Sequence, residues 1–186
     1  FMKKSVWIIT FLLFTFGIFY FFKSEPKTAS KTPLIEQNAT LSTDYTKPFR
    51  LNLTDKNFIK MQKTKSGFSI ENNATMTIFA FFASWCEACR VQNEILNSIA
   101  AKYTSNVQVI GVLINDDIDK NATYAFADNL KFPVAFGESN DYFAGALGGV
   151  AGIPFMVMFD NKGKIIENFS GLVPEEILST EIERNF

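Results

Sequence analysis

The sequence contains no histidine, and only two of its 186 residues are cysteines. Without histidine the chain has neither an imidazole general base nor the commonest nitrogen ligand of zinc. The formal net charge is −1 and no long basic run is present, so nucleic acid is not an expected partner. These absences disfavour histidine-based catalysis, zinc sites and nucleic-acid binding.

Apolar residues, in contrast, are plentiful: 47% of the chain is hydrophobic and 15% is aromatic. That is enough apolar material for a buried core. Because domains usually contain about 100–200 residues, the length predicts one domain with additional segments.

The first such segment is an uncharged, mostly apolar run over residues 6–22, preceded by Lys3 and Lys4. As a helix it would span about 26 Å, close to the ~30 Å of a hydrocarbon core. We therefore expect a signal-anchor or transmembrane segment at residues 1–22, with the body of the chain exported. A cleaved signal peptide is the alternative, although no small-x-small cleavage site follows the run.

Residues 23–48 are rich in Ser, Thr, Pro and Lys and contain few apolar residues. This composition is typical of a flexible tether. The folded domain is then expected over residues 49–186.

The middle of this domain has the pattern of a strand, a helix and a second strand. Residues 75–82 and 107–114 are continuous apolar runs of strand length, as expected for strands buried on both faces. Between them Val91, Ile95 and Ile99 recur every four residues, which predicts a helix that starts after the first cysteine. Such a βαβ unit has parallel strands and a right-handed crossover. Further helices are expected at 116–131, 141–147 and 175–184, and further strands at 133–136, 155–159 and 164–169.

The two cysteines, Cys86 and Cys89, stand where the first strand ends and the helix begins. A zinc site normally needs four ligands, and a structural disulfide closing so small a loop would restrain the unfolded chain little. A redox pair explains the placement better. The free N–H groups and the dipole of a helix N-terminus favour a thiolate at Cys86, which is the attacking species in thiol–disulfide exchange. Cys89, one turn further on, can then resolve the mixed disulfide.

Two motifs resemble those of thioredoxin-like proteins. Trp85-Cys86-x-x-Cys89 follows an F-F-A-S run, and Gly152-Ile153-Pro154 precedes a predicted strand in the manner of the cis-proline loop of that family. The anchor, the tether and the Cys-Glu-x-Cys motif are most similar to the membrane-tethered ResA/TlpA/CcmG group. The resemblance covers residues 49–186 and implies an α/β thioredoxin fold, a central mixed sheet flanked by helices.

The resemblance also implies a function, that of a thiol–disulfide oxidoreductase. Its working group would be the Cys86–Cys89 disulfide, with no other cofactor and no metal. Trp85 would shield the pair, and a cis Ile153–Pro154 peptide bond would face the disulfide and dock the substrate backbone. An ordinary proline capping a strand is the alternative for Pro154.

The expected partners follow from the same group. They are protein thiols and disulfides, including the haem-site cysteines of apocytochrome c, and a transmembrane thiol reductase as electron donor. The expected location is the bacterial inner membrane, with the domain in the periplasm. Two other functions stay open: a thiol oxidant, and a non-enzymatic tethered binding module that uses the cis-proline groove.

The sequence departs from the family at three positions. Ala80 stands where thioredoxins carry a buried aspartate, Gln92 where the ResA-like group often carries glutamate, and Ala88 where proline is usual. Neither usual proton relay is therefore expected. An acid restored by Gln92→Glu is expected to change the pH dependence of exchange. Near the pair, Glu87 should oppose a thiolate and Arg90 should favour it.

Three asparagines, Asn38, Asn73 and Asn121, each begin an Asn-Ala-Thr sequon and follow an acid two positions earlier. The pattern resembles the acidic-extended sequon of bacterial periplasmic N-glycosylation. Chance occurrence in an Asn-rich sequence is the alternative. If these sequons are modified, they should lie in exposed segments.

Overall fold

The computed structural model describes residues 44–186. The expected anchor at 1–22, most of the tether at 23–48 and Asn38 lie outside the described residues. Within residues 44–186 no helix is long and apolar enough to cross a membrane.

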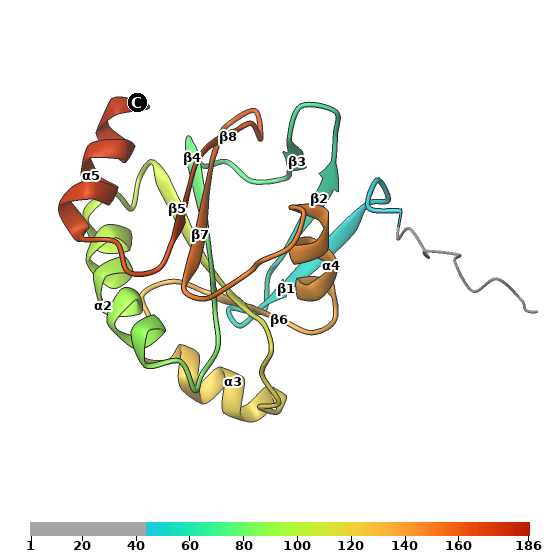
Figure 1. The fold of residues 1–186 in the computed structure, drawn as a ribbon, viewed down its shortest axis with the longest axis vertical. Helices are drawn as coiled ribbons and strands as arrows, with labels where there is room; N and C mark the ends of the chain where they lie inside the picture. The colour runs from blue at the N-terminus through green and yellow to red at the C-terminus, as the bar shows by residue number, and fades with distance from the viewer. Residues whose placement is uncertain (1–43) are drawn as a thin grey trace, which may run out of the picture. The chain divides into compact units, whose positions relative to one another are not determined.

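The described residues form an eight-stranded mixed sheet with the order β3-β2-β1-β6-β5-β4-β7-β8 (Figure 1). Strands β4, β5 and β6 run parallel to one another, and every other neighbouring pair is antiparallel. The strands are β1 (Phe49–Leu53), β2 (Phe58–Lys63), β3 (Phe68–Ile70), β4 (Met76–Phe82), β5 (Val107–Leu113), β6 (Val134–Phe136), β7 (Phe155–Asp160) and β8 (Ile165–Ser170).

Helices cover both faces of this sheet. The helices are α2 (Glu87–Lys102), α3 (Lys120–Ala127), α4 (Ser139–Ala146) and α5 (Glu175–Arg184). Helices α2 and α5 lie side by side on one face, and α4 packs on the other (Figure 1). The fold is the expected thioredoxin-like α/β arrangement.

Strand β4 explains why two cores form. All seven of its residues are buried. Ile78 and Ala80 belong to the core beneath α2 and α5, whereas Phe79 and Phe81 belong to the core beneath α4. Side chains alternate between the faces of a strand, so a continuous apolar run gives each face its own core.

The β4–α2–β5 unit confirms the predicted strand–helix–strand pattern, with boundaries within one residue of those expected. Helix α3 is shorter than the expected 116–131. The Asp119 side chain accepts a hydrogen bond from the backbone N–H of Ala122 at 2.8 Å, which caps the helix so that it begins at Lys120.

Strands β1, β2 and β3 were not expected from the sequence. They form an antiparallel meander, and Leu53 of β1 pairs with Ala135 of β6, which joins the meander to the parallel strands. Residues 44–48, which the composition assigns to the tether, also contact this domain. The Tyr45 ring lies 5.1 Å from that of Tyr142, and the Tyr142 hydroxyl donates to the Asp44 carbonyl at 2.6 Å. The domain therefore extends to Asp44 rather than beginning at Phe49.

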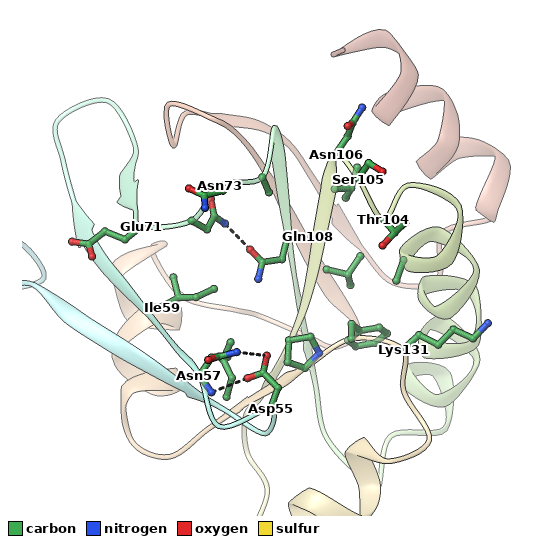
Figure 2. Close-up of a pocket in the computed structure, with 18 of the residues that line it drawn as sticks. Asp55, Asn57, Ile59, Glu71, Asn73, Thr104, Ser105, Asn106, Gln108 and Lys131 are labelled. Carbon is green, nitrogen blue, oxygen red and sulfur yellow. Dashed lines mark hydrogen bonds between the residues drawn. The ribbon is translucent and has the colours of Figure 1, made fainter.

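A cleft of about 670 Å³ opens between the meander and the start of β5 (Figure 2). Ile59, Glu71, Asn106 and Gln108 are among the residues that line it. The cysteines follow the opposite end of β4, about 20 Å away at the rise of a strand. This cleft is therefore separate from the disulfide.

Candidate active site

Helix α2 presents Cys86 at its first turn. Cys86 is the N-cap residue in an extended conformation, and its Sγ accepts a hydrogen bond from the Cys89 backbone N–H at 3.1 Å. The next helical bond runs from the Arg90 N–H to the Cys86 carbonyl, also at 3.1 Å. The predicted position at the helix N-terminus is confirmed, and an N–H group points at the sulfur where a thiolate would form.

Cys86 and Cys89 form a disulfide, and their Cα atoms are 5.2 Å apart. Cys86 is 9% exposed and Cys89 only 1%. Both lie in an apolar cluster with Phe82 and Leu113, which end β4 and β5, and with Val134, which begins β6. An attacking or attacked partner can therefore reach Cys86 more readily than Cys89.

The loop before the cysteines is held by the loop after β5. Trp85 is 67% exposed, and its Nε1 donates to the Asn115 carbonyl at 2.9 Å. The Ser84 N–H donates to the carboxylate of Asp116. Neither Asn115 nor Asp116 was predicted from the sequence to belong to the site. The available signal was topological, because the carboxyl ends of adjacent parallel strands meet at one edge of a sheet.

The loop at Ile153 lies against the same cluster. The Ile153–Pro154 peptide bond is cis, and the half-buried Ile153 packs against the cluster that contains both cysteines. The Pro154 carbonyl accepts a hydrogen bond from the Gly171 N–H at 2.8 Å, which ties the loop to the end of β8. The structure thus brings Trp85, the cysteine pair and the Ile153–Pro154 loop to one edge of the sheet.

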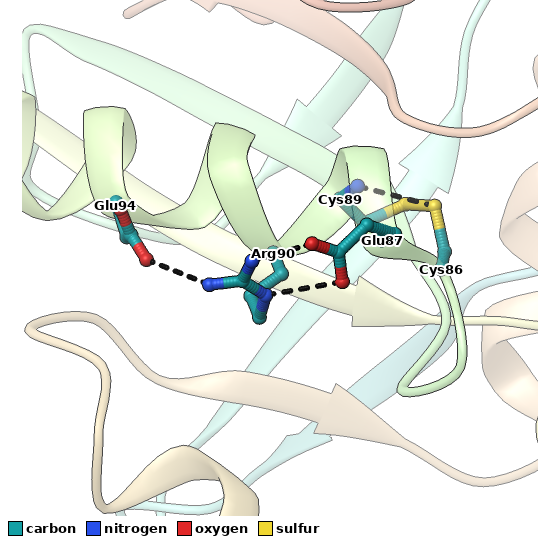
Figure 3. A network of polar contacts seen from close by, with 5 residues as sticks. All are labelled: Cys86, Glu87, Cys89, Arg90 and Glu94. Carbon is teal, nitrogen blue, oxygen red and sulfur yellow. Dashed lines mark hydrogen bonds and ion pairs between the residues drawn. A yellow bond between two sulfur atoms is a disulfide. The ribbon is translucent and has the colours of Figure 1, made fainter.

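Three charged side chains lie on the solvent face of α2, with Glu87 and Arg90 near the disulfide and Glu94 further along the helix (Figure 3). Arg90 donates to both carboxylate oxygens of Glu87, and its Nη1 donates to Glu94 at 3.3 Å. The hydrogen bond and positive charge of Arg90 lower the pKa of Glu87, which keeps that carboxyl ionised. Because Glu87 and Glu94 both pair with Arg90, their opposition to a thiolate at Cys86 is partly cancelled.

Ala80 and Gln92, where the family resemblance implies an acid, make no hydrogen bond to either cysteine. Ala80 is buried in the core under α2 and α5. Gln92 is buried, and its amide pairs in both directions with the Val173 backbone: Oε1 accepts from the N–H at 2.8 Å, and Nε2 donates to the carbonyl at 3.3 Å. Within residues 44–186 no Asp, Glu, Lys or Arg side chain is buried. The pair therefore has no buried acid or base beside it.

Asn93, a buried amide on α2 four residues after Cys89, was not predicted from the sequence either. Its Nδ2 has no hydrogen-bond partner. The spacing from Cys89 was a usable signal, because residues four apart on a helix are neighbours.

Comparison with known proteins agrees with this geometry. The sequence profile of the family described as Redoxin matches residues 51–183. The thiol:disulfide interchange protein HelX of Rhodobacter capsulatus is 29% identical over 55% of this chain and 56% of its own length. The thiol-disulfide oxidoreductase ResA of Bacillus cereus is 27% identical over 56% of this chain and 60% of its own.

A similar solved structure is also assigned as a thiol:disulfide interchange protein. The Chlorobium tepidum protein assigned as thiol:disulfide interchange protein DsbE superposes with a TM-score of 0.57 at 25% identity, covering 76% of this chain and 95% of that one. With a helix-capping Cys-x-x-Cys disulfide and a family match over most of its length, the chain belongs to the Redoxin family and is a thiol–disulfide oxidoreductase.

Proposed function

We propose that the protein is a membrane-tethered reductant of protein disulfides, with the haem-site cysteines of apocytochrome c as substrate. The observation that carries the proposal is the Cys86–Cys89 disulfide at the N-terminus of α2, with the Ile153–Pro154 loop packed against it. Similarity to proteins named thiol-disulfide oxidoreductase ResA and thiol:disulfide interchange proteins HelX and DsbE supports protein disulfides as the substrate class.

In the proposed reaction the Cys86 thiolate attacks one sulfur of a substrate disulfide. That S–S bond breaks, one substrate thiolate leaves, and Cys86 is joined to the other substrate sulfur. Cys89 then attacks Sγ of Cys86, which releases the second substrate thiolate and forms the Cys86–Cys89 disulfide. Two electrons pass from the pair to the substrate, and the two substrate thiolates take up protons. The backbone at Ile153 docks the substrate strand, and the exposed Trp85 stands directly before Cys86.

The roles of the two cysteines can be tested by trapping. Cys89→Ser should accumulate mixed disulfides with substrate proteins, because nothing resolves the bond at Cys86, whereas Cys86→Ser should accumulate none. Non-reducing electrophoresis with an apocytochrome c peptide carrying a Cys-x-x-Cys-His disulfide provides the measurement. Trapping by Cys86→Ser alone would reverse the assignment, and a control peptide with the same composition but distant cysteines tests substrate choice.

The second candidate is a thiol oxidant. The observation in its favour is the Cys89 N–H directed at the Cys86 sulfur, because stabilising the thiolate favours the reduced pair and makes the disulfide more oxidising. The reduction potential separates the two directions. A value near that of thioredoxin, about −270 mV, supports a reductant, and one near −120 mV supports an oxidant.

A binding module without redox chemistry is the third candidate for the biological role. It predicts that changing both cysteines to serine leaves that role intact. The reductant proposal predicts its loss, measured as cytochrome c maturation in cells that carry only the double variant.

The tether and location complete the proposal. Residues 1–22 anchor the chain, the tether that ends before Asp44 holds the domain off the membrane, and the domain faces the periplasm, where a transmembrane thiol reductase restores the dithiol. Fractionation followed by protease access to intact spheroplasts tests this arrangement. Recovery of the whole chain in the cytoplasmic fraction would contradict it.

We also propose that Asn73 is an N-glycan acceptor. Glu71, Asn73 and Thr75 are all exposed in the connection between β3 and β4, beside the cleft and away from the disulfide. Asn121 differs, because its sequon lies in α3 and Thr123 is buried with its hydroxyl donating to the Asp119 carbonyl at 2.9 Å. Asn121 can therefore be modified only before the chain folds. Asn38, which lies outside the described residues, is the third proposed acceptor. Glycopeptide mass spectrometry of the protein from its native cells tests all three, and unmodified Asn73 would end the proposal.

A further inference from the structure

We propose that Asn93 donates a hydrogen bond from Nδ2 to the sulfur of Cys89 in the reduced protein. This bond supports the thiolate with which Cys89 resolves the mixed disulfide. The inference rests on the proposed resolving role of Cys89 and is independent of the direction of electron flow.

The first observation is an amide donor without an acceptor. Asn93 is 4% exposed, and its Nδ2 is buried without a hydrogen-bond partner. The other buried side-chain amides in residues 44–186 use their donors: Gln92 donates to Val173, and Asn140 donates to Leu113 and Ala135. Buried donors are nearly always paired in native proteins, so an unpaired one calls for an explanation.

The second observation is where this donor lies. Asn93 follows Cys89 by four residues on α2, and such neighbours have Cβ atoms about 5–6 Å apart. Helical side chains lean toward the N-terminus, so the Asn93 amide lies over the turn that carries Cys89. One turn further along the same face, Asn97 accepts from the Lys131 N–H at 2.7 Å. The face therefore looks toward the connection between α3 and β6.

The third observation concerns the other buried polar side chains in residues 44–186. They are Thr77, Gln92, Thr123 and Asn140, and each hydrogen-bonds to a group other than Cys89. The charged side chains on or beside the elements packed around the cysteines are exposed or half-exposed; they are Glu87, Arg90, Glu94 and Lys102 on α2, Asp116 and Asp117 after β5, Asp119, Lys120 and Asp128 on or beside α3, and Lys131 before β6. None of them is buried beside the Cys89 sulfur.

Reduction supplies the acceptor that Asn93 lacks. In the disulfide neither sulfur carries charge, and sulfur is then a weak acceptor. When the S–S bond takes up two electrons, Cys89 can become a thiolate, and a hydrogen bond to a charged group is stronger than one to a neutral group. An amide cannot take the proton of Cys89. In resolution that proton goes to the departing substrate thiolate, while Asn93 stabilises the charge on the attacking sulfur.

The direct test is the side-chain amide signal of Asn93 in ¹H–¹⁵N spectra of the full chain. We expect both amide protons to shift on reduction and to shift again as Cys89 titrates. Asn97, of the same type on the same helix face but already bonded, is the internal control and should move little. Identical Asn93 signals in the oxidised and reduced protein would overturn the inference.

The functional test compares Asn93→Leu with Asn97→Leu. Asn93→Leu keeps a similar volume without the donor. We expect about a tenfold smaller equilibrium constant for reduction by glutathione, which is a potential about 30 mV more negative. We also expect a mixed disulfide at Cys86 to persist longer. Asn97→Leu should leave both quantities unchanged.

Equal potentials and equal mixed-disulfide lifetimes in Asn93→Leu and the unsubstituted protein would contradict the inference. If Asn93→Leu fails to fold, the spectra of the unsubstituted protein still decide it. Failure of Cys89→Ser to trap any partner would instead refute the proposed role of Cys89, which the amide shift on reduction does not test.

Discussion

Helix α2 carries two buried amides at adjacent positions, and they lie in different surroundings. On the side of α5, Gln92 uses both its oxygen and its nitrogen to hold the Val173 backbone. On the side of α3, Asn93 leaves its nitrogen unpartnered beside the turn that carries Cys89. The first amide joins two segments of the fold, and the second has a partner only if the nearby sulfur changes its state.

The difference shows how to separate structural from functional polar groups in this helix. A buried amide with every bond made contributes to stability, and its removal strands the groups it served. A buried amide with a bond missing costs stability, and such exceptions are expected at functional sites. Position 92 often carries an acid in the ResA-like group, yet here its side chain has become part of the α2–α5 packing.

Among the substitutions on α2, Gln92→Glu should lower the free energy of unfolding the most. The introduced carboxyl cannot donate to the Val173 carbonyl once ionised, and a poorly compensated buried charge costs about 3–5 kcal/mol. Burial raises the pKa of the introduced carboxyl above its unfolded value. Stability should therefore be least affected below about pH 4 and should fall as the pH rises. Urea unfolding at pH 4 and pH 7 gives the measurement.

An equal loss at both pH values would show that the introduced side chain has reached solvent. A changed pH profile of exchange, without a loss of stability, would show that position 92 faces the thiols after all. The contacts with Val173 predict instead that stability is lost mainly at pH 7 and that the pH profile of exchange stays unchanged.

Gln92→Leu should have the next largest effect. It leaves the N–H and carbonyl of buried Val173 unpaired, and each stranded group costs about 1–3 kcal/mol. The matched variant Asn93→Leu removes an amide whose donor serves no acceptor in the oxidised protein, so its loss of stability should be under about 1 kcal/mol. Equal losses of stability in the two oxidised variants would show that the Gln92 and Asn93 amides contribute alike, which would contradict the proposed difference between them.

The smallest effect should come from Arg90→Gln on the solvent face. Arg90 lowers the pKa of Glu87, so this pair contributes stability above the unfolded pKa of the carboxyl, and that contribution is lost as the pH falls through the lowered value. The groups are exposed, so little stability should change. Carboxyl NMR should show the Glu87 pKa rising in the variant. An unchanged value would mean that the ion pair does not persist in solution.

Much of the fold could be predicted because β4, α2 and β5 form from local patterns. The continuous apolar run that becomes β4 and the four-residue apolar repeat in α2 can be read from the sequence without tertiary information. Strands β1 and β2 were not predicted because their apolar alternation is short and is interrupted by a polar turn. The buried residues of this alternation are Leu51, Leu53, Ile59 and Met61. Their place beside β6 depends on pairing over about eighty residues, which no local pattern encodes.

The site divides in the same way. Cys86 and Cys89 are recognisable because their chemistry and their place at a strand–helix junction coincide. The partners of Trp85, Ser84 and Gln92 are not, because Asn115, Asp116 and Val173 come from loops far along the chain. Whether a buried amide is satisfied depends on those distant groups, and only the structure reveals it.

The most direct test of the central claim, that Cys86 and Cys89 act together in exchange, is a thiol balance. The reduced protein is mixed with a disulfide-bonded peptide, quenched with an alkylating reagent and analysed by mass spectrometry. We predict that every peptide disulfide lost yields two peptide thiols and one Cys86–Cys89 disulfide, and that Cys86→Ser yields neither. Peptide reduction by Cys86→Ser at the normal rate, or a reduced pair that never transfers electrons to the peptide, would contradict the account.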